Sequence, residues 1–171
     1  MPFIEVPEGE GANLERVFSL RPDVYAAWRE LVTAVKATSD ERRYELATLA
    51  AAKRLRSSYC SLAHGKMLVD RFYAAEEVLN LPGGLDETDA AIMAFAEKVA
   101  DDASTVTRDD VERLRGLGLS DAEITDVVLA AALRSFFAKT LDGLGALPDA
   151  VYGELDPELR DELTVGRPIE G

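Results

Sequence analysis

The sequence predicts an all-α protein, and two observations support this fold class. Apolar residues recur at the three- and four-residue spacing of amphipathic helices in several segments, and helix-capping residues precede many of them. No run of useful length alternates apolar and polar residues, as a half-buried strand does. With 171 residues, of which 47% are hydrophobic, the chain can bury a real core, and we expect one domain over residues 1–171.

The N-terminal half is expected to contain an arm and four helices. Two prolines and two glycines within the first eleven residues favour an extended arm over a helix. Pro22 suits the first turn of one helix, and Ser39 can cap the next. Strong helix formers give way to serines after Arg56, so the fourth helix should begin at Ser57 or Ser58. The expected boundaries are residues 1–12 for the arm and about 14–18, 22–36, 39–56 and 57–73 for the helices.

The C-terminal half is expected to contain three more helices and a tail. Asp86 and Thr107 can each cap a helix. Ser120 and Glu123 form a capping-box pattern, in which each side chain satisfies a free backbone amide of the other residue. Gly143 should end the long helix that starts there. We expect helices at about 86–99, 107–116 and 120–143, about seven in all, and then a polar tail over residues 146–171 with a short helix at 157–163.

The composition excludes several classes of protein. A formal net charge of -13 would repel a phosphate backbone, and no segment approaches the roughly 18 apolar residues of a membrane span, so we expect no nucleic-acid and no membrane partner. The start of the chain has no leader pattern, and its single cysteine cannot form an intramolecular disulfide, so we expect a reducing, cytoplasmic location. Phosphate-binding and haem-attachment motifs are absent, and one Cys with one His makes a poor zinc site, so we expect no cofactor and no metal.

Positive charge is concentrated around the cysteine. Between Arg42 and Arg71 the chain has seven basic residues and only two acidic ones. One explanation is that these basic side chains lie on solvated helix faces or form salt bridges with acidic helices. The other is a site for an anion or a thiolate. The sequence leaves both explanations open.

Cys60, the only cysteine, is the centre of the candidate chemistry. In the first turn of a helix its sulfur lies near backbone amides and the positive end of the helix dipole, which favour a thiolate. His64, the only histidine, lies four residues later on the same face and can exchange a proton with the sulfur directly or through one water. Antiparallel pairing with the preceding helix would bring Glu45 to the imidazole or the sulfur. Taken singly, each residue also fits a structural role, and only their joint spacing favours catalysis.

This spacing resembles the AhpD-like, or carboxymuconolactone decarboxylase, superfamily, in particular its peroxidase-related branch. The family pattern has a glutamate, eleven residues, a Cys-x-x-Cys pair, three residues and a histidine. Here Glu45, Ser57, Cys60 and His64 keep every spacing. The likeness extends outside the motif to residues 20–22, 43–46, 111–118, 119–121 and 142–145. It implies an AhpD-like all-α fold, with the cysteine helix at a subunit interface of a homo-oligomer such as a dimer, trimer or hexamer.

The resemblance also implies roles for the site residues. Cys60 corresponds to the more reactive second cysteine of the pair, and Glu45 and His64 would assist its proton transfer. Ser57 and Tyr59 are the supporting residues beside it. Because Ser57 stands where the family has its first cysteine, a disulfide cycle within one chain is impossible.

Three functions remain open. The first is a peroxidase-like, alkylhydroperoxidase-related antioxidant function, in which Cys60 attacks a small-molecule peroxide and an external thiol reduces it again. The second is a carboxymuconolactone-decarboxylase-like lyase or isomerase, in which His64 and Glu45 handle protons. The third is a redox-inactive helical oligomer. The branch often has an Asn-Arg pair where this chain has Ala138 and Lys139, which leaves any contact of that arginine unassigned.

Overall fold

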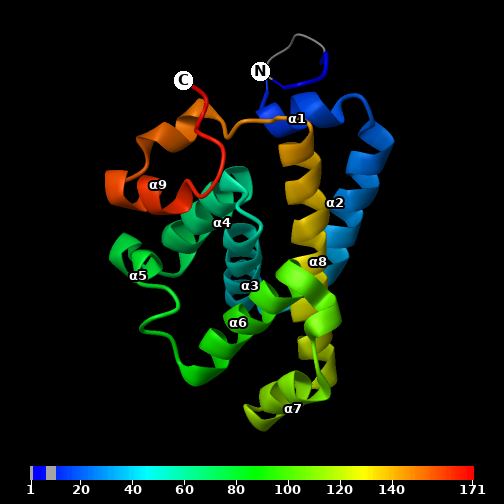
Figure 1. Ribbon diagram of the computed structural model, residues 1–171, viewed down its shortest axis with the longest axis vertical. Coiled ribbons are helices and arrows are strands. Elements are labelled where there is room, and N and C mark those ends of the chain that lie inside the picture. Colours follow the sequence, from blue (N-terminus) through cyan, green and yellow to red (C-terminus); the bar gives the residue numbers. More distant parts are fainter. Residues whose placement is uncertain (1, 7–10) are drawn as a thin grey trace.

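The computed structural model describes residues 2–6 and 11–171, and in these residues every regular element is a helix (Figure 1). The all-α fold class is therefore confirmed. The α-helices are α1 (Asn13–Phe18), α2 (Pro22–Lys36), α3 (Glu41–Arg54), α4 (Ser58–Arg71), α5 (Ala75–Leu79), α6 (Glu87–Asp102), α7 (Arg108–Gly116), α8 (Asp121–Gly143) and α9 (Pro157–Leu163). Two short 3-10 helices are also present, η1 (Ala103–Thr105) after α6 and η2 (Ala150–Glu154) before α9.

Helix α3 lies at the centre of the fold and packs against α4, α6 and α8. All of its residues from 44 to 52 are buried, so it has no solvent-exposed face over that length. Four of these residues are alanines, whose small side chains let the neighbouring helices approach closely. A polar side chain on this stretch must therefore find a partner inside the protein.

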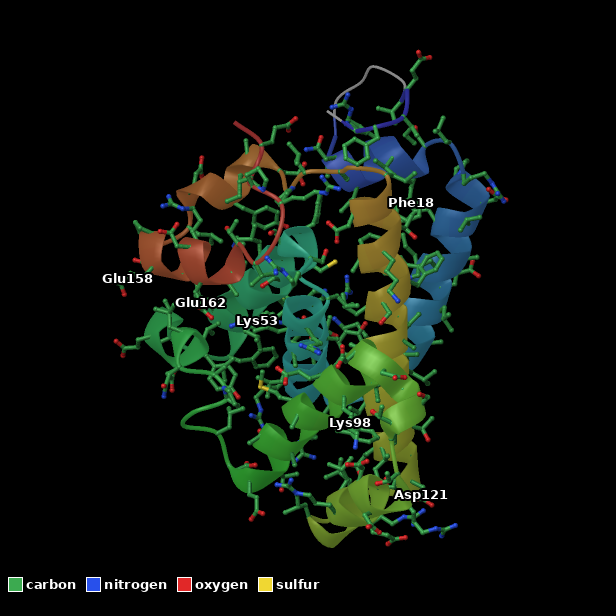
Figure 2. The ribbon with its side chains drawn as sticks, in the orientation of Figure 1. Phe18, Lys53, Lys98, Asp121, Glu158 and Glu162 are labelled. Atoms are coloured by element: carbon green, nitrogen blue, oxygen red, sulfur yellow. The ribbon has the colours of Figure 1, made fainter. Side chains whose placement is uncertain are left out.

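Helix α8 is the longest helix and runs along one side of the molecule beside α2 (Figure 1). The predicted capping box is present, because Ser120 Oγ accepts from the Glu123 amide and the Glu123 carboxylate accepts from the Ser120 amide at 2.8 Å. In Figure 2, Asp121 marks the start of this helix and Phe18 lies near its other end. Phe18 stacks on Phe137 there, with 5.3 Å between the ring centroids.

Some local expectations need adjustment. The described residues form nine α-helices, because short α5 is separate from α4, and the short helix expected in the tail is present as α9. Asp40, not Ser39, caps α3, and its carboxylate accepts from the Arg43 amide at 2.9 Å. In the arm, residues 2–6 form no helix, and the Phe3 amide donates to the Leu144 carbonyl at 2.9 Å. Residues 1 and 7–10 of the expected arm lie outside the described residues.

The basic residues around the cysteine are engaged in ion pairs, so the structural explanation of this charged segment is correct. Six of the seven pair with acidic side chains, which are Arg42 and Arg43 with Asp89, Lys53 with Glu162, Arg54 with Asp101, Lys66 with Asp70, and Arg71 with Glu41. The seventh, Arg56, donates to the Val165 carbonyl at 3.3 Å. Lys53 and Glu162 connect α3 to α9 (Figure 2). In the described part of the chain, no helix is both long and apolar enough to cross a membrane.

The segment after α9 packs against the start of α4, close to the cysteine. The Gly166 amide donates to Ser58 Oγ at 2.8 Å, and Ser58 is fully buried as the first residue of α4. Gly166 lies so close to the α3–α4 turn that a Cβ atom there would overlap the backbone oxygen of Arg56. The C-terminal segment therefore fixes the position of the first turn of α4.

We expect Gly166→Ala to lower the free energy of unfolding by about 1–3 kcal/mol, because the Arg56 carbonyl cannot move without shifting the start of α4. Urea unfolding followed by circular dichroism measures this change. Gly143→Ala is the matched control, since a Cβ at Gly143 would have no atom within 4 Å and the residue ends a helix. That variant should be neutral or stabilised by up to about 1 kcal/mol. Equal stabilities of the two variants would contradict the close approach.

Candidate functional site

Glu45 is a buried carboxylate with a partner on each oxygen. The turn between α3 and α4, in which Arg56 adopts a φ of 55°, brings the two helices together. Glu45 is only 1% exposed, and its Oε2 lies 2.5 Å from His64 Nδ1. Its Oε1 accepts from Lys36 Nζ, at the end of α2, at 2.8 Å. The structure therefore brings Glu45 to the imidazole, one of the two contacts that the sequence allowed.

These contacts set the protonation of the pair. Burial alone would raise the pKa of Glu45, but the hydrogen bonds from His64 and Lys36, and the positive charge that each has when protonated, outweigh it and lower that pKa to about 2. Burial and the nearby Arg134 charge lower the pKa of His64 to about 4, although Glu45 acts in the opposite direction. At neutral pH the glutamate is thus ionised and the imidazole is neutral. The ring proton must then lie on Nδ1, where it donates to Glu45, and Nε2 is left as an acceptor.

The sulfur of Cys60 contacts a buried arginine. Cys60 is the third residue of α4, as its predicted first-turn position requires, and is 1% exposed. Its Sγ accepts a hydrogen bond from Arg134 Nη1, on α8, at 3.3 Å. Among the described residues no hydrogen bond joins Cys60 to His64 directly, but both side chains line the same pocket. A proton can therefore pass between them through a molecule bound in that pocket.

This pocket has a volume of about 200 Å³ and largely aromatic walls. Trp28 stacks on Phe137, with 4.1 Å between the ring centroids, and the Arg134 guanidinium carbon lies 5.5 Å from the Phe137 centroid. The pocket is lined by Leu14, Tyr25, Trp28, Val32, Lys36, Tyr44, Tyr59, Cys60, Ala63, His64, Arg134, Phe137 and Tyr152. Within the described ranges, no group of three His, Cys, Asp or Glu side chains is placed to hold a metal ion.

The two supporting residues have different positions. The Tyr59 hydroxyl donates to the Asp149 carboxylate and accepts from the Leu14 amide at 3.3 Å, and its ring lines the pocket. Burial and the Asp149 charge raise the pKa of Tyr59, so the hydroxyl keeps its proton. Ser57 is the N-cap residue of α4, fully buried, and does not line the pocket. Tyr59 thus forms part of the pocket wall, whereas Ser57 is buried outside the pocket lining.

Sequence reasoning missed Arg134 and Lys36. The buried positions Ile124, Val127, Ala131, Ala138 and Leu141 of α8 have helical spacing, and Arg134 occupies the place in this stripe that an apolar residue would fill. An arginine in a buried stripe was therefore a signal in the sequence. Lys36 gives no such signal, because its partner Glu45 lies on another helix.

The residues that replace the family's Asn-Arg pair do not supply a second guanidinium. Ala138 is buried and Lys139 is exposed at the surface of α8. The buried arginine of this helix is Arg134, one turn earlier. The charge beside the cysteine thus comes from a position outside the motif.

Solved structures resemble this chain in fold. An uncharacterised peroxidase-related protein from Ralstonia eutropha JMP134, described as an alkylhydroperoxidase AhpD core, has a TM-score of 0.77 at 19% identity over 97% of this chain and 98% of that one. A peroxidase-related protein from Silicibacter sp. TM1040 has a TM-score of 0.74 at 16% identity over 81% and 77% of the two chains. The debrominase Bmp8 has a TM-score of 0.74 at 13% identity over 88% and 82%.

These likenesses rest on structure alone. No protein-family model and no curated protein sequence matches the chain. At such identities the solved structures show the fold, and the fold that the sequence resemblance implied is confirmed by them. The chain has the AhpD-like fold.

Proposed function

We propose that the protein is a peroxidase-like thiol oxidoreductase in which Cys60 reacts with a peroxide. One observation supports this more than any other. The only cysteine of the chain lies in an aromatic pocket beside a buried guanidinium and a neutral histidine that is paired with an ionised glutamate. A nucleophile, a proton acceptor and a fixed positive charge are the parts that a thiol reaction with a peroxide requires. The AhpD-like fold of peroxidase-related proteins supports the same function.

His64 would carry the proton of the reaction. As the substrate binds, the Cys60 thiol proton passes to Nε2 of His64, and the Glu45 carboxylate stabilises the imidazolium that forms. The sulfur attacks the outer peroxide oxygen, so an S–O bond forms and the O–O bond breaks. The departing alkoxide takes the proton from His64 and leaves as an alcohol. Cys60 is oxidised to a sulfenic acid, and the peroxide is reduced.

Arg134 would stabilise the sulfur during this attack. Its guanidinium already donates to Sγ at 3.3 Å and is only 4% exposed, so water screens its charge weakly. Negative charge that develops on the sulfur is therefore stabilised by a cation that needs no reorganisation.

An external thiol would complete the cycle. The chain has no second cysteine, and Ser57 cannot form a disulfide with Cys60. A small-molecule or protein thiol would condense with the sulfenic acid, which releases water and leaves a mixed disulfide. A second thiol would then attack the external sulfur of that disulfide and release the Cys60 thiol.

We expect one equivalent of cumene hydroperoxide at pH 7 to add one oxygen atom to Cys60, which dimedone then traps as a sulfenic acid adduct. Intact-mass and peptide mass spectrometry measure both products. Cys60→Ser should give neither, and His64→Gln should slow the oxidation about 100-fold or more, because the proton acceptor is lost.

A Cys60 thiol that stays unmodified at neutral pH would contradict this function. For candidate lyase substrates, a turnover that survives Cys60→Ala and disappears in His64→Ala would favour the lyase or isomerase reaction instead.

The role of His64 as proton acceptor requires its ring to be neutral, and this has a consequence for stability. The pKa of His64 is about 4 in the folded protein and 6.5 ordinarily, so the unfolded chain takes up the proton first as the pH falls. The stabilisation is complete above pH 6.5 and is lost as the pH falls toward 4.

We therefore expect the wild-type protein to lose about 1–2 kcal/mol more free energy of unfolding between pH 7 and pH 5 than His64→Gln. Urea unfolding at the two pH values measures the difference. Glu45 contributes little in this window, because its ordinary pKa of 4.5 lies below it. Parallel losses in both proteins would show that folding does not lower the pKa of His64.

A further inference from the structure

We infer that the pocket beside Cys60 binds a small aromatic carboxylate, with Arg134 as the residue that selects the negative charge. This rests on the proposed function and adds its substrate class, an aromatic peroxide that carries a carboxylate group. Unsatisfied donors, a lining arginine without an acidic partner, and the size and lining of the pocket support it.

Arg134 has no acidic partner. In the described part of the chain its guanidinium forms no ion pair, and its one hydrogen bond goes from Nη1 to the sulfur of Cys60. Its Nε is buried and has no hydrogen-bond partner. A buried guanidinium without a carboxylate loses its hydration and gains little in return. The guanidinium therefore lacks an acceptor that a ligand could supply.

A second unsatisfied donor lines the same pocket. Trp28 Nε1 is buried without a hydrogen-bond partner. Both Trp28 and Arg134 contact Phe137, the first by stacking at 4.1 Å and the second at 5.5 Å from the ring centroid. Two unsatisfied donors favour a ligand that brings acceptors to them. A carboxylate does so, and its two oxygens match the planar fork of an arginine.

The charges of the pocket also favour an anion. Lys36 and Arg134 are the cations among the lining residues, and Glu45 pairs with Lys36 and with the neutral His64. Asp149 lies outside the lining and accepts from the Tyr59 hydroxyl. Arg134 is therefore the lining cation that no acidic side chain of the described residues pairs with. A bound carboxylate would pair with it directly.

The size and walls of the pocket favour a single aromatic ring. Its volume of about 200 Å³ exceeds the roughly 150 Å³ of a cavity that holds benzene, which leaves room for a carboxylate. Six of its lining residues are aromatic, namely Tyr25, Trp28, Tyr44, Tyr59, Phe137 and Tyr152. Aromatic rings pack favourably against such walls.

Titration calorimetry at pH 7 with benzoate, benzamide and acetate tests the inference on the full chain. Benzoate should bind at least about 10-fold more tightly than benzamide, which has its shape without its charge, and than acetate, which lacks the ring. Arg134→Gln should abolish the preference for benzoate over benzamide. Arg113→Gln, at an exposed arginine of α7, is the matched control and should keep it.

Equal binding of benzoate and benzamide by the wild-type protein, or no binding of either, would overturn the inference. This comparison needs no variant, so it decides the question even where Arg134→Gln fails to fold. Benzoate should also bind to Cys60→Ser, which has no thiolate. Loss of benzoate binding in that variant would show that Arg134 serves the sulfur alone.

The benzoate experiment and the peroxide experiment can fail independently of each other. Peroxide oxidation of Cys60 without a preference for benzoate would overturn this inference and leave the function intact. A preference for benzoate in a protein whose Cys60 resists peroxide would overturn the function and retain the anion site.

Discussion

The burial of the Glu45 carboxylate is the constraint on which the rest of the site depends. Helix α3 is enclosed by its neighbours, so a charge on it must be satisfied from other helices. Lys36 reaches one oxygen from α2, and His64 reaches the other from α4. These two contacts link α2 and α4 to α3, and the second holds the imidazole beside the pocket in one orientation. The geometry of the site is therefore a consequence of how the fold satisfies a single buried acid.

Burial also determines which groups of the site are charged. Glu45 is surrounded by donors and stays ionised, whereas His64 lies between that carboxylate and Arg134 and stays neutral. Arg134 donates to the sulfur of Cys60 and lies against the ring of Phe137. An ionised acid, a neutral base and a cation beside a thiol can thus coexist within one pocket. Ser57 limits the chemistry of an oxidised sulfur, because a sulfenic acid at Cys60 has no second thiol in the chain to condense with.

Local signals in the sequence predicted most of the fold. The capping box at Ser120, the N1 proline of α2 and the caps at Asp86 and Thr107 all begin helices where they were expected, because such motifs act over a few residues. The buried side of α2 is harder to predict. Leu31 is 51% exposed, whereas Trp28 and Val32 of the same helix pack against the core. Which apolar side of a helix is buried depends on its neighbours, which one helix cannot specify.

The candidate site was predictable to the extent that its residues share one helix pair. Glu45 and His64 meet because α3 and α4 are joined by a short turn, and the sequence spacing implied this. Arg134 lies 74 residues from Cys60, and their contact depends on how α8 packs in three dimensions. The basic residues near Cys60 in the sequence do not form a cationic site, since most of them pair with acidic side chains on the surface. Proximity in sequence suggested a cationic site, but the buried charge came from another helix.

The protonation of His64 tests this picture most directly. As the only histidine of the chain, it gives a single set of imidazole nitrogen resonances in a 15N-labelled protein. We expect these resonances at pH 7 to show a neutral ring with its proton on Nδ1 and a bare Nε2, and a pKa of about 4 on titration. An imidazolium at pH 7, or a neutral ring with its proton on Nε2, would contradict the proposed role of His64 as proton acceptor for Cys60.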